Sequence, residues 1–158
     1  MPIRKLKRFL DEENVNYEAI SHSKTETAHQ TAHAVKMSDK DIAKTVMVKV
    51  DGKMAMIVLP ASHKIHFNML ERELGAKNIE LATEEEFKEY FPECEIGAMP
   101  PFGNLYNLDV IVSYALKDDE MIAFNAGTHE EAIRMSYKDF ERLVEPRIAR
   151  FTLSSFDY

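Results

Sequence analysis

A lysine at the start of an apolar strand is the first residue whose surroundings could support chemistry. Lys44 precedes a run of β-forming residues, 45–50. Because side chains alternate between the two faces of a strand, Lys44 shares a face with Val46, Val48 and Val50. Its ammonium must either reach solvent from the strand end, with its stem covering apolar surface, or point into a cavity. In a cavity, the charge would suit a phosphate or a developing oxyanion.

Two glycine-bearing segments could bind a polar group through their main chain. Residues 97–103 read Gly-Ala-Met-Pro-Pro-Phe-Gly, and residues 125–129 read Asn-Ala-Gly-Thr-His. Paired prolines between glycines make a stiff loop that holds its backbone groups in place, so a ligand or oxyanion binds with little ordering cost. Neither segment has the glycine spacing of a Walker loop or a dinucleotide fingerprint. Each alone is typical of a structural turn, but their combination with Lys44 favours a binding site.

Metal and nucleophile chemistry find weaker support. The pairs His29-x-x-x-His33 and His63-x-x-His66 have spacings that zinc could use, but His29 lacks the following Glu of a metalloprotease, and no cysteine or carboxylate motif accompanies either pair. Cys94 is the single cysteine, and no G-x-S-x-G elbow occurs. We therefore expect neither a metal nor a cofactor.

Charge and composition limit the class of partner. The chain has 158 residues and a formal net charge of −7, which argues against a duplex-DNA binder. Its dense basic cluster includes Arg4, Lys5 and Arg8, which form either a solvated helix face or a local contact for a polyanion. The longest apolar run, 54–59, is strand-sized, and no apolar stretch follows the basic N-terminus. With one cysteine, these features predict a cytoplasmic protein without membrane contact.

The periodicities predict one α+β domain over residues 1–158, since no repeat, linker or low-complexity tract interrupts the chain. Asp51-Gly52 between β-forming runs predicts a tight hairpin. Interposed helices favour a mixed, mostly antiparallel sheet over a doubly wound parallel one. The expected helices are 3–14, 28–37, 67–74, 84–91 and 137–144, and the expected strands are 17–20, 45–50, 54–59, 110–112, 121–124 and, as the last core strand, 132–135.

Four segments in order resemble a known family. They are 43–49 (Ala-Lys-Thr-Val-Met-Val-Lys), 58–61 (Val-Leu-Pro-Ala), 97–103 and 124–129. Together they are similar to the YbaK and prolyl-tRNA-synthetase-associated editing domains, which hydrolyse misacylated tRNA. The resemblance covers nearly the whole chain. It implies a β-sheet closing towards a barrel, with helices packed outside.

The resemblance also implies roles for residues. Lys44 would hold the terminal adenosine phosphate or neutralise charge near the scissile ester, and the 97–103 backbone would cradle the aminoacyl group and position water. His129 would set the size of the amino-acid pocket. The implied catalytic positions are Lys44 and Gly103, the implied substrate contacts are Thr45, Gly97, Pro100, Pro101, Phe102, Asn125, Gly127, Thr128 and His129, and the implied tRNA contacts are Arg4, Lys5 and Arg8.

The sequence therefore favours a freestanding hydrolase that cleaves misacylated tRNA at its acceptor end, with a synthetase as a further partner. An aminoacyl ester is already activated, so positioned water and oxyanion stabilisation suffice without a Ser-His-Asp triad. In this family the substrate's own ribose hydroxyl is thought to help. The alternative is a catalytically silent module that binds an amino-acid-like ligand or a partner protein.

Overall fold

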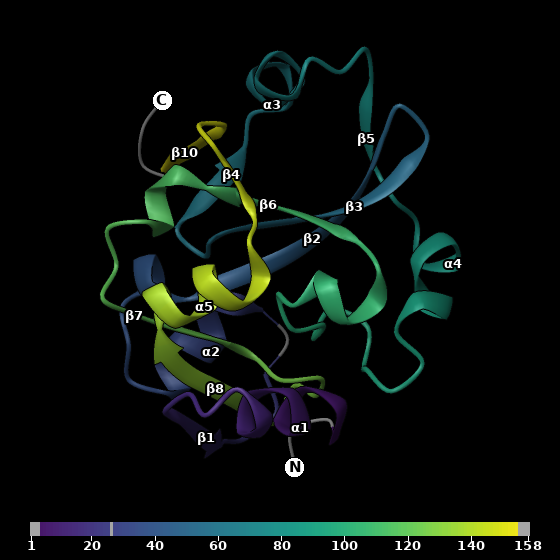
Figure 1. Cartoon of the computed structure of the whole chain (residues 1–158). Helices are drawn as coiled ribbons and strands as arrows, with labels where there is room; N and C mark the ends of the chain where they lie inside the picture. The colour runs from purple at the N-terminus through teal and green to yellow at the C-terminus, as the bar shows by residue number, and fades with distance from the viewer. Residues whose placement is uncertain (1–3, 26, 155–158) are drawn as a thin grey trace.

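A mixed five-stranded sheet forms the centre of the computed structural model, which describes residues 4–25 and 27–154 (Figure 1). Its strand order is β5-β2-β3-β6-β9. The β5–β2 and β2–β3 pairs are antiparallel, and the β3–β6 and β6–β9 pairs are parallel. The strands are β2 (Ala43–Val50), β3 (Lys53–Pro60), β5 (Ile79–Leu81), β6 (Asp109–Ser113) and β9 (Arg147–Ala149).

The β2–β3 hairpin confirms the prediction made from Asp51-Gly52. Both turn residues have positive φ, 50° at Asp51 and 86° at Gly52, which is the conformation that a tight primed turn requires. The Asp51 carboxylate also accepts hydrogen bonds from the amides of Lys77 and Asn78 at 3.0 and 2.8 Å. The register places Lys44 opposite Leu59, at the end of the hairpin away from the turn.

Two smaller sheets complete the β-structure. One has the order β1-β8-β7, with β1 (Tyr17–Ser21), β7 (Met121–Asn125) and β8 (Glu131–Ser136); the other pairs β4 (His63–Ile65) with β10 (Thr152–Ser154). Both are antiparallel, so five of the seven strand pairings in residues 4–25 and 27–154 are antiparallel, as predicted. A parallel bridge between Ile42 and Ala123 links β7 to the residue before β2. Closure towards a barrel stays a prediction.

Local signals place the helices where the sequence predicts them. Thr27, Thr83 and Ser136 accept hydrogen bonds from backbone amides as N-caps, and Gly75 ends a helix in the left-handed conformation. The first helix ends at Glu12 rather than near Asn14, and the second at Ala34 rather than near Met37. The helix expected at 84–91 ends at Phe87 and is followed by a 3-10 helix over Lys88–Tyr90. The helices are α1 (Arg4–Glu12), α2 (Ala28–Ala34), α3 (Phe67–Leu74), α4 (Glu84–Phe87) and α5 (Tyr137–Val144).

Four strands of three residues each, β4, β5, β9 and β10, were not predicted. The strand predicted at 132–135 is confirmed as β8, but it is not the last strand, because β9 and β10 follow α5. Three residues are too few to display an alternating pattern, so such strands are defined by their partners rather than by their own sequence.

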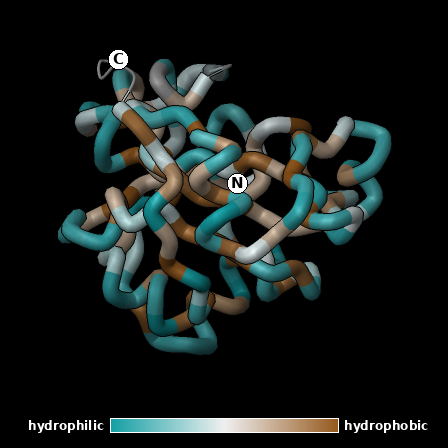
Figure 2. Tube along the Cα trace, turned by 90° about the horizontal axis from the view of Figure 1, so that it is seen from above, coloured by the Kyte–Doolittle hydropathy of each residue, from teal (hydrophilic) through white to brown (hydrophobic). Residues whose placement is uncertain are grey.

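The β2–β3 hairpin is covered on both faces. Met47, Met56 and Val58 belong to a core with α1, α5 and the second sheet, whereas Val48, Ile57 and Leu59 belong to another core with α3. Figure 2 shows the hydrophobic segments of the trace mostly inside and the hydrophilic ones mostly in peripheral loops. Within the described ranges, no helix is long and apolar enough to cross a membrane.

An ion pair beside the central sheet allows a direct test of the fold. Lys49 on β2 lies 2.5 Å from the carboxylate of Glu86 on α4. This hydrogen bond, with that of the Thr83 amide, lowers the pKa of Glu86 to about 2. Because the pKa is lowered by folding, the pair stabilises the fold above the ordinary Glu pKa of about 4.3 and loses this contribution as pH falls towards 2.

We expect Lys49→Met to raise the pKa of Glu86 towards its ordinary value, measured by an NMR pH titration of the side-chain carboxyl. The matched control is Lys88→Met, because Lys88 pairs with Glu85 at 3.2 Å and should leave Glu86 unchanged. An identical Glu86 titration in wild type and Lys49→Met would contradict the proposed packing of α4 on β2.

Candidate functional site

A small cavity surrounds the start of β2 and contains Lys44. Its volume is about 180 Å³. It brings together four residues that the sequence analysis selected, Lys44, Thr45, Gly97 and Asn125, from three segments distant in the chain. The complete lining is Thr27, Ala28, Ile42, Ala43, Lys44, Thr45, Gly97, Met99 and Asn125.

Lys44 is half-buried, and its environment disfavours its charge. Burial first, and then the positive charge of Lys64, lower the pKa of Lys44 below its ordinary value. Lys64 lies on β4, which follows closely after Pro60, the residue that pairs with Ala43 beside Lys44. Of the two alternatives left open by the sequence, the structure favours the cavity. A cation held there is poorly solvated and available to an incoming anion.

The two glycine-bearing segments are hydrogen-bonded to each other. The Glu95 amide donates to the Gly127 carbonyl at 2.7 Å, and the Gly127 amide donates to the Ala98 carbonyl at 2.9 Å. The Glu95 carboxylate accepts a hydrogen bond from the His129 amide at 2.7 Å. We call these three bonds the loop clamp. It fixes the 97–103 segment relative to β7, from which Asn125 enters the cavity.

Gly97 needs to be glycine at this position. Its φ is +86°, and a Cβ there would lie 3.4 Å from the His129 ring. The His129 Nε2–H donates to the carbonyl of Ile96 at 2.8 Å. His129 itself does not belong to the lining of the Lys44 cavity. The ring therefore supports the loop that carries Gly97, whereas the resemblance predicts that it forms the amino-acid pocket.

The second half of the 97–103 segment lies in the core. Pro100, Pro101, Phe102 and Gly103 are buried and do not line the Lys44 cavity. The Phe102 ring contacts the rings of Phe9, Phe124 and Phe140, with centroids 5.6–6.1 Å apart. Gly103 is enclosed by Leu108 and Val110. These residues anchor the loop from behind.

Two further predicted contacts also lie outside the lining. Gly127 is buried and takes part in the loop clamp through its main chain. The Thr128 hydroxyl accepts a hydrogen bond from the Glu130 amide at 3.3 Å.

The basic residues of α1 do not reach the Lys44 cavity. Arg4, Lys5 and Arg8 are exposed, and the Lys5 ammonium lies 4.7 Å from the centre of the Tyr106 ring. Lys5 lines a separate depression beside Tyr106. The cation that lies close to Lys44 is instead Lys64, which no sequence signal singled out.

His63 and His66 have structural partners. His63 Nδ1 shares a hydrogen bond of 2.8 Å with the Thr152 hydroxyl, and His66 Nδ1 accepts the Met69 amide as the N-cap of α3. The side chain of His29 lies outside the described part of the chain. Among the residues that are described, no three His, Cys, Asp or Glu side chains form a group that could hold a metal ion.

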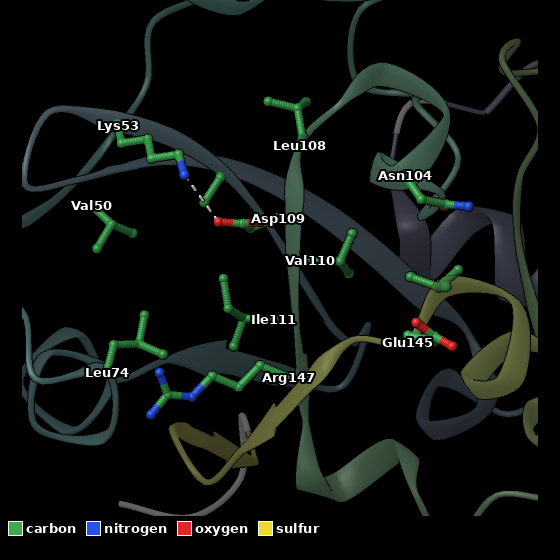
Figure 3. A pocket seen from close by; sticks show the side chains of 12 residues that line it. Val50, Lys53, Leu74, Asn104, Leu108, Asp109, Val110, Ile111, Glu145 and Arg147 are labelled. Atoms are coloured by element: carbon green, nitrogen blue, oxygen red, sulfur yellow. Dashed lines mark hydrogen bonds and ion pairs between the residues drawn. The ribbon is translucent and has the colours of Figure 1, made fainter.

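A larger cavity of about 500 Å³ lies at the other end of β2 (Figure 3). Six residues of strand, about 20 Å, separate Lys44 from Val50 in its wall. Its apolar floor is bordered by exposed ionic groups, including the Lys53–Asp109 pair at 3.4 Å. It lacks the half-buried cation and the glycine loop of the smaller cavity. The lining is Val50, Lys53, Ala55, Leu74, Asn104, Leu108, Asp109, Val110, Ile111, Val144, Glu145 and Arg147.

Sequence reasoning missed several lining residues. Thr27 and Ala28 were interpreted as a helix start, which they are, but α2 also presents them to the cavity. Ile42 and Ala43 gave no chemical signal. In the sequence, Met99 stands out only as a departure from the family's loop pattern that could bear on the choice of amino acid, not as part of a cavity wall. No sequence pattern could have identified these residues as a group, because they come from segments that are distant in sequence and meet only in the folded structure.

Gly103 offers a test that separates packing from chemistry. A Cβ at this position would lie 2.6 Å from Val110 Cγ2 and 3.0 Å from the Leu108 carbonyl oxygen. We expect Gly103→Ala to lower the free energy of unfolding by about 1–3 kcal/mol, measured by urea denaturation. The same change should cost less in a Val110→Ala background, where the clashing methyl is gone. Equal costs in both backgrounds would argue against this packing role.

Comparisons with known proteins identify the family of the chain. The family described as aminoacyl-tRNA editing domain matches residues 22–143. A proline–tRNA ligase of Halalkalibacterium halodurans is 29% identical over 107 residues, which cover 68% of this chain and 18% of the ligase. A proline–tRNA ligase of Bacillus cereus (strain G9842) is 32% identical over 79 residues, which cover 50% of this chain and 14% of the ligase. The chain thus spans less than a fifth of the length of these curated relatives.

The fold is shared with solved structures. A crystal structure described as a candidate trans-editing enzyme for prolyl tRNA synthetase superposes with a TM-score of 0.82 at 20% identity, and the match covers 96% of each chain. The family match includes β2, the hairpin turn, both glycine-bearing segments and β8. The chain therefore belongs to the aminoacyl-tRNA editing domain family.

Proposed function

We propose that this protein hydrolyses the ester bond of a misacylated tRNA in trans, in the cavity around Lys44. The observation that carries the proposal is the presence of a half-buried ammonium and a rigid glycine loop in one small cavity. Membership of the editing-domain family supports a deacylase-type role. The local similarity to proline–tRNA ligases supports a tRNA handled by such a synthetase, and the synthetase itself, as partners.

The reaction requires little acid–base chemistry from the protein. A water oxygen attacks the ester carbonyl carbon, and the carbonyl oxygen gains negative charge. The carbon–oxygen bond to the ribose then breaks, the proton of the water ends on the ribose oxygen, and a free amino acid leaves. Lys44 stabilises the negative charge of the transition state or of the terminal phosphate, and this effect is large because the cation is desolvated.

The other predicted residues divide into contacts and supports. Thr45, Gly97 and Asn125 line the cavity and contact the aminoacyl end. Pro100, Pro101, Phe102 and Gly103 hold the loop from the core side, so their effect on catalysis is indirect. Gly127, Thr128 and His129 support the loop through main-chain and ring contacts.

The tRNA body needs cations outside the cavity. Lys64 is the nearest candidate for a backbone phosphate, because its charge acts on Lys44. Arg4, Lys5 and Arg8 lie on α1. This helix packs against the core side of the 97–103 segment, where the ring centroids of Phe9 and Phe102 are 6.1 Å apart. We propose that they contact the acceptor stem farther from its 3′ end.

The central test is release of amino acid from a panel of mischarged tRNAs by wild type and Lys44→Ala. Loss of one transition-state donor or cation costs about 10²–10³ in rate, so we expect kcat/KM of Lys44→Ala to fall by about 100-fold or more. The matched control is Lys53→Ala, because Lys53 lines the larger cavity at the other end of β2 and should leave the rate unchanged.

Each result has a distinct meaning. No release by wild type from any tRNA, under conditions where another deacylase acts, would overturn the hydrolase proposal; retained binding of the tRNA would then favour the silent module. Equal rates for wild type and Lys44→Ala would contradict the role of Lys44 but not the hydrolase proposal.

A second test concerns the charge on Lys44. Because Lys64 lowers the pKa of Lys44, Lys64→Gln should raise that pKa, measured by NMR titration of the Lys44 ε-methylene. In wild type, the positive charge is lost as pH rises through the lowered pKa, so the variant keeps its cation to higher pH. Lys53→Gln is the control and should leave the titration unchanged. An unchanged Lys44 pKa in Lys64→Gln would show that the two lysines do not interact.

A further inference from the structure

We propose that Met99 sets the size limit for the amino acid, and that His129 is a positioning residue for the loop rather than the wall of the pocket. This inference rests on the proposed function, because it identifies what the same cavity selects. It departs from the expectation carried by the family resemblance, which gives the size limit to His129.

The cavity is small enough for its walls to select by size. Its volume is about 180 Å³. A small aminoacyl side chain fits this space, whereas a large one requires a wall to move. The residue that sets the limit must therefore line the cavity and be able to change its volume.

Met99 meets both conditions. It lines the cavity two residues after Gly97, and only 5% of its surface is exposed. Its side chain also belongs to the core cluster that contains Phe102 and Phe124, so it forms the boundary between cavity and core. A thioether on an unbranched side chain changes rotamer readily, so Met99 can adjust to side chains of slightly different size.

The other apolar lining residues are poor candidates. Ala28 and Ala43 carry only a methyl group, so their truncation changes the cavity little. Ile42 is 1% exposed and carries the bridge to Ala123 that links β7 to the start of β2. Truncation of Ile42 would alter that link as well as the cavity. Met99 is thus the apolar side chain whose length controls the cavity volume without joining the sheets.

His129 has a different set of contacts. Its Nε2–H donates to the Ile96 carbonyl at 2.8 Å, and its amide donates to the Glu95 carboxylate at 2.7 Å. Its ring lies against Gly97, where a Cβ would be 3.4 Å away. Loss of the ring removes the support behind Gly97 and leaves the apolar wall formed by Met99 in place. The expected defect is a lower rate for every substrate, without a change in preference.

The experiment compares Met99→Ala with His129→Ala on tRNAs charged with alanine and with valine. We expect Met99→Ala to raise the ratio of kcat/KM for valyl-tRNA over alanyl-tRNA by about 10-fold or more. The reason is that one or two methylene groups change discrimination in an apolar pocket by at least that factor. His129→Ala should lower kcat for both substrates by a similar factor and leave the ratio unchanged. His129→Gln should restore part of kcat, because its amide can donate to Ile96 in place of Nε2–H.

Controls separate selection from core damage. Met47→Ala truncates a methionine of the same core that does not line the cavity, so it should lower stability without changing the ratio. Met99→Val makes a smaller change if Met99→Ala does not fold. Binding of alanyl- and valyl-adenosine linked by a 3′-amide, which resists ester hydrolysis, gives the same size comparison independently of turnover.

The outcomes are distinguishable from failure of the proposed function. If wild type releases no amino acid, the hydrolase proposal fails, and the amide analogues still test Met99 through their relative affinities. A ratio that changes in His129→Ala and stays constant in Met99→Ala would overturn the inference. A ratio unchanged in both variants, by turnover and by binding, would overturn it as well.

Discussion

The loop clamp is the interaction on which the rest of the site depends. Residues 95–98 and 127–129 belong to irregular segments, and buried backbone groups in such segments need partners. The amides of Glu95 and Gly127 and the carbonyls of Gly127 and Ala98 find them in each other. The clamp therefore gives two loops a single fixed geometry. Without it, the position of Gly97 relative to Lys44 on β2 would depend only on the core packing of residues 100–103 and on the His129–Ile96 hydrogen bond.

The position of Lys44 follows from the burial of both faces of β2. In the middle of the strand, from Val46 to Val48, each face packs on one core, so a charged side chain is excluded there. At the start of the strand, the loop and α2 leave a cavity instead of packed side chains. Lys44 lies there, where its pKa is lowered and its charge is available. The larger cavity near Val50 has more volume and exposed charges, but charges in water act weakly on a reacting group.

Local signals explain how much of the fold could be predicted. Asp51-Gly52, the caps at Thr83 and Ser136, and the stop at Gly75 each act within a few residues, and all were predicted correctly. The site was predicted only in outline. Gly97 and Gly103 look equivalent in the sequence, yet one is required by a positive φ and the other by contact with Val110. Which reason applies depends on neighbours that are distant in the chain, as does the proximity of Lys64 to Lys44.

The five-stranded sheet and the β1-β8-β7 sheet meet at this site, so the contact that joins them also determines the geometry of the cavity. Ile42 bridges Ala123, so the residues that follow each of them, Lys44 and Asn125, enter the same cavity two positions later. A shift of one sheet relative to the other would move these two side chains apart. The bridge is short, and its alignment is reinforced by packing around Ile42 and by the loop clamp. Met99 neither contributes to the bridge nor forms the hydrogen bonds of the loop clamp. A substitution of Met99 therefore changes the volume of the cavity while the distance between Lys44 and Asn125 stays fixed.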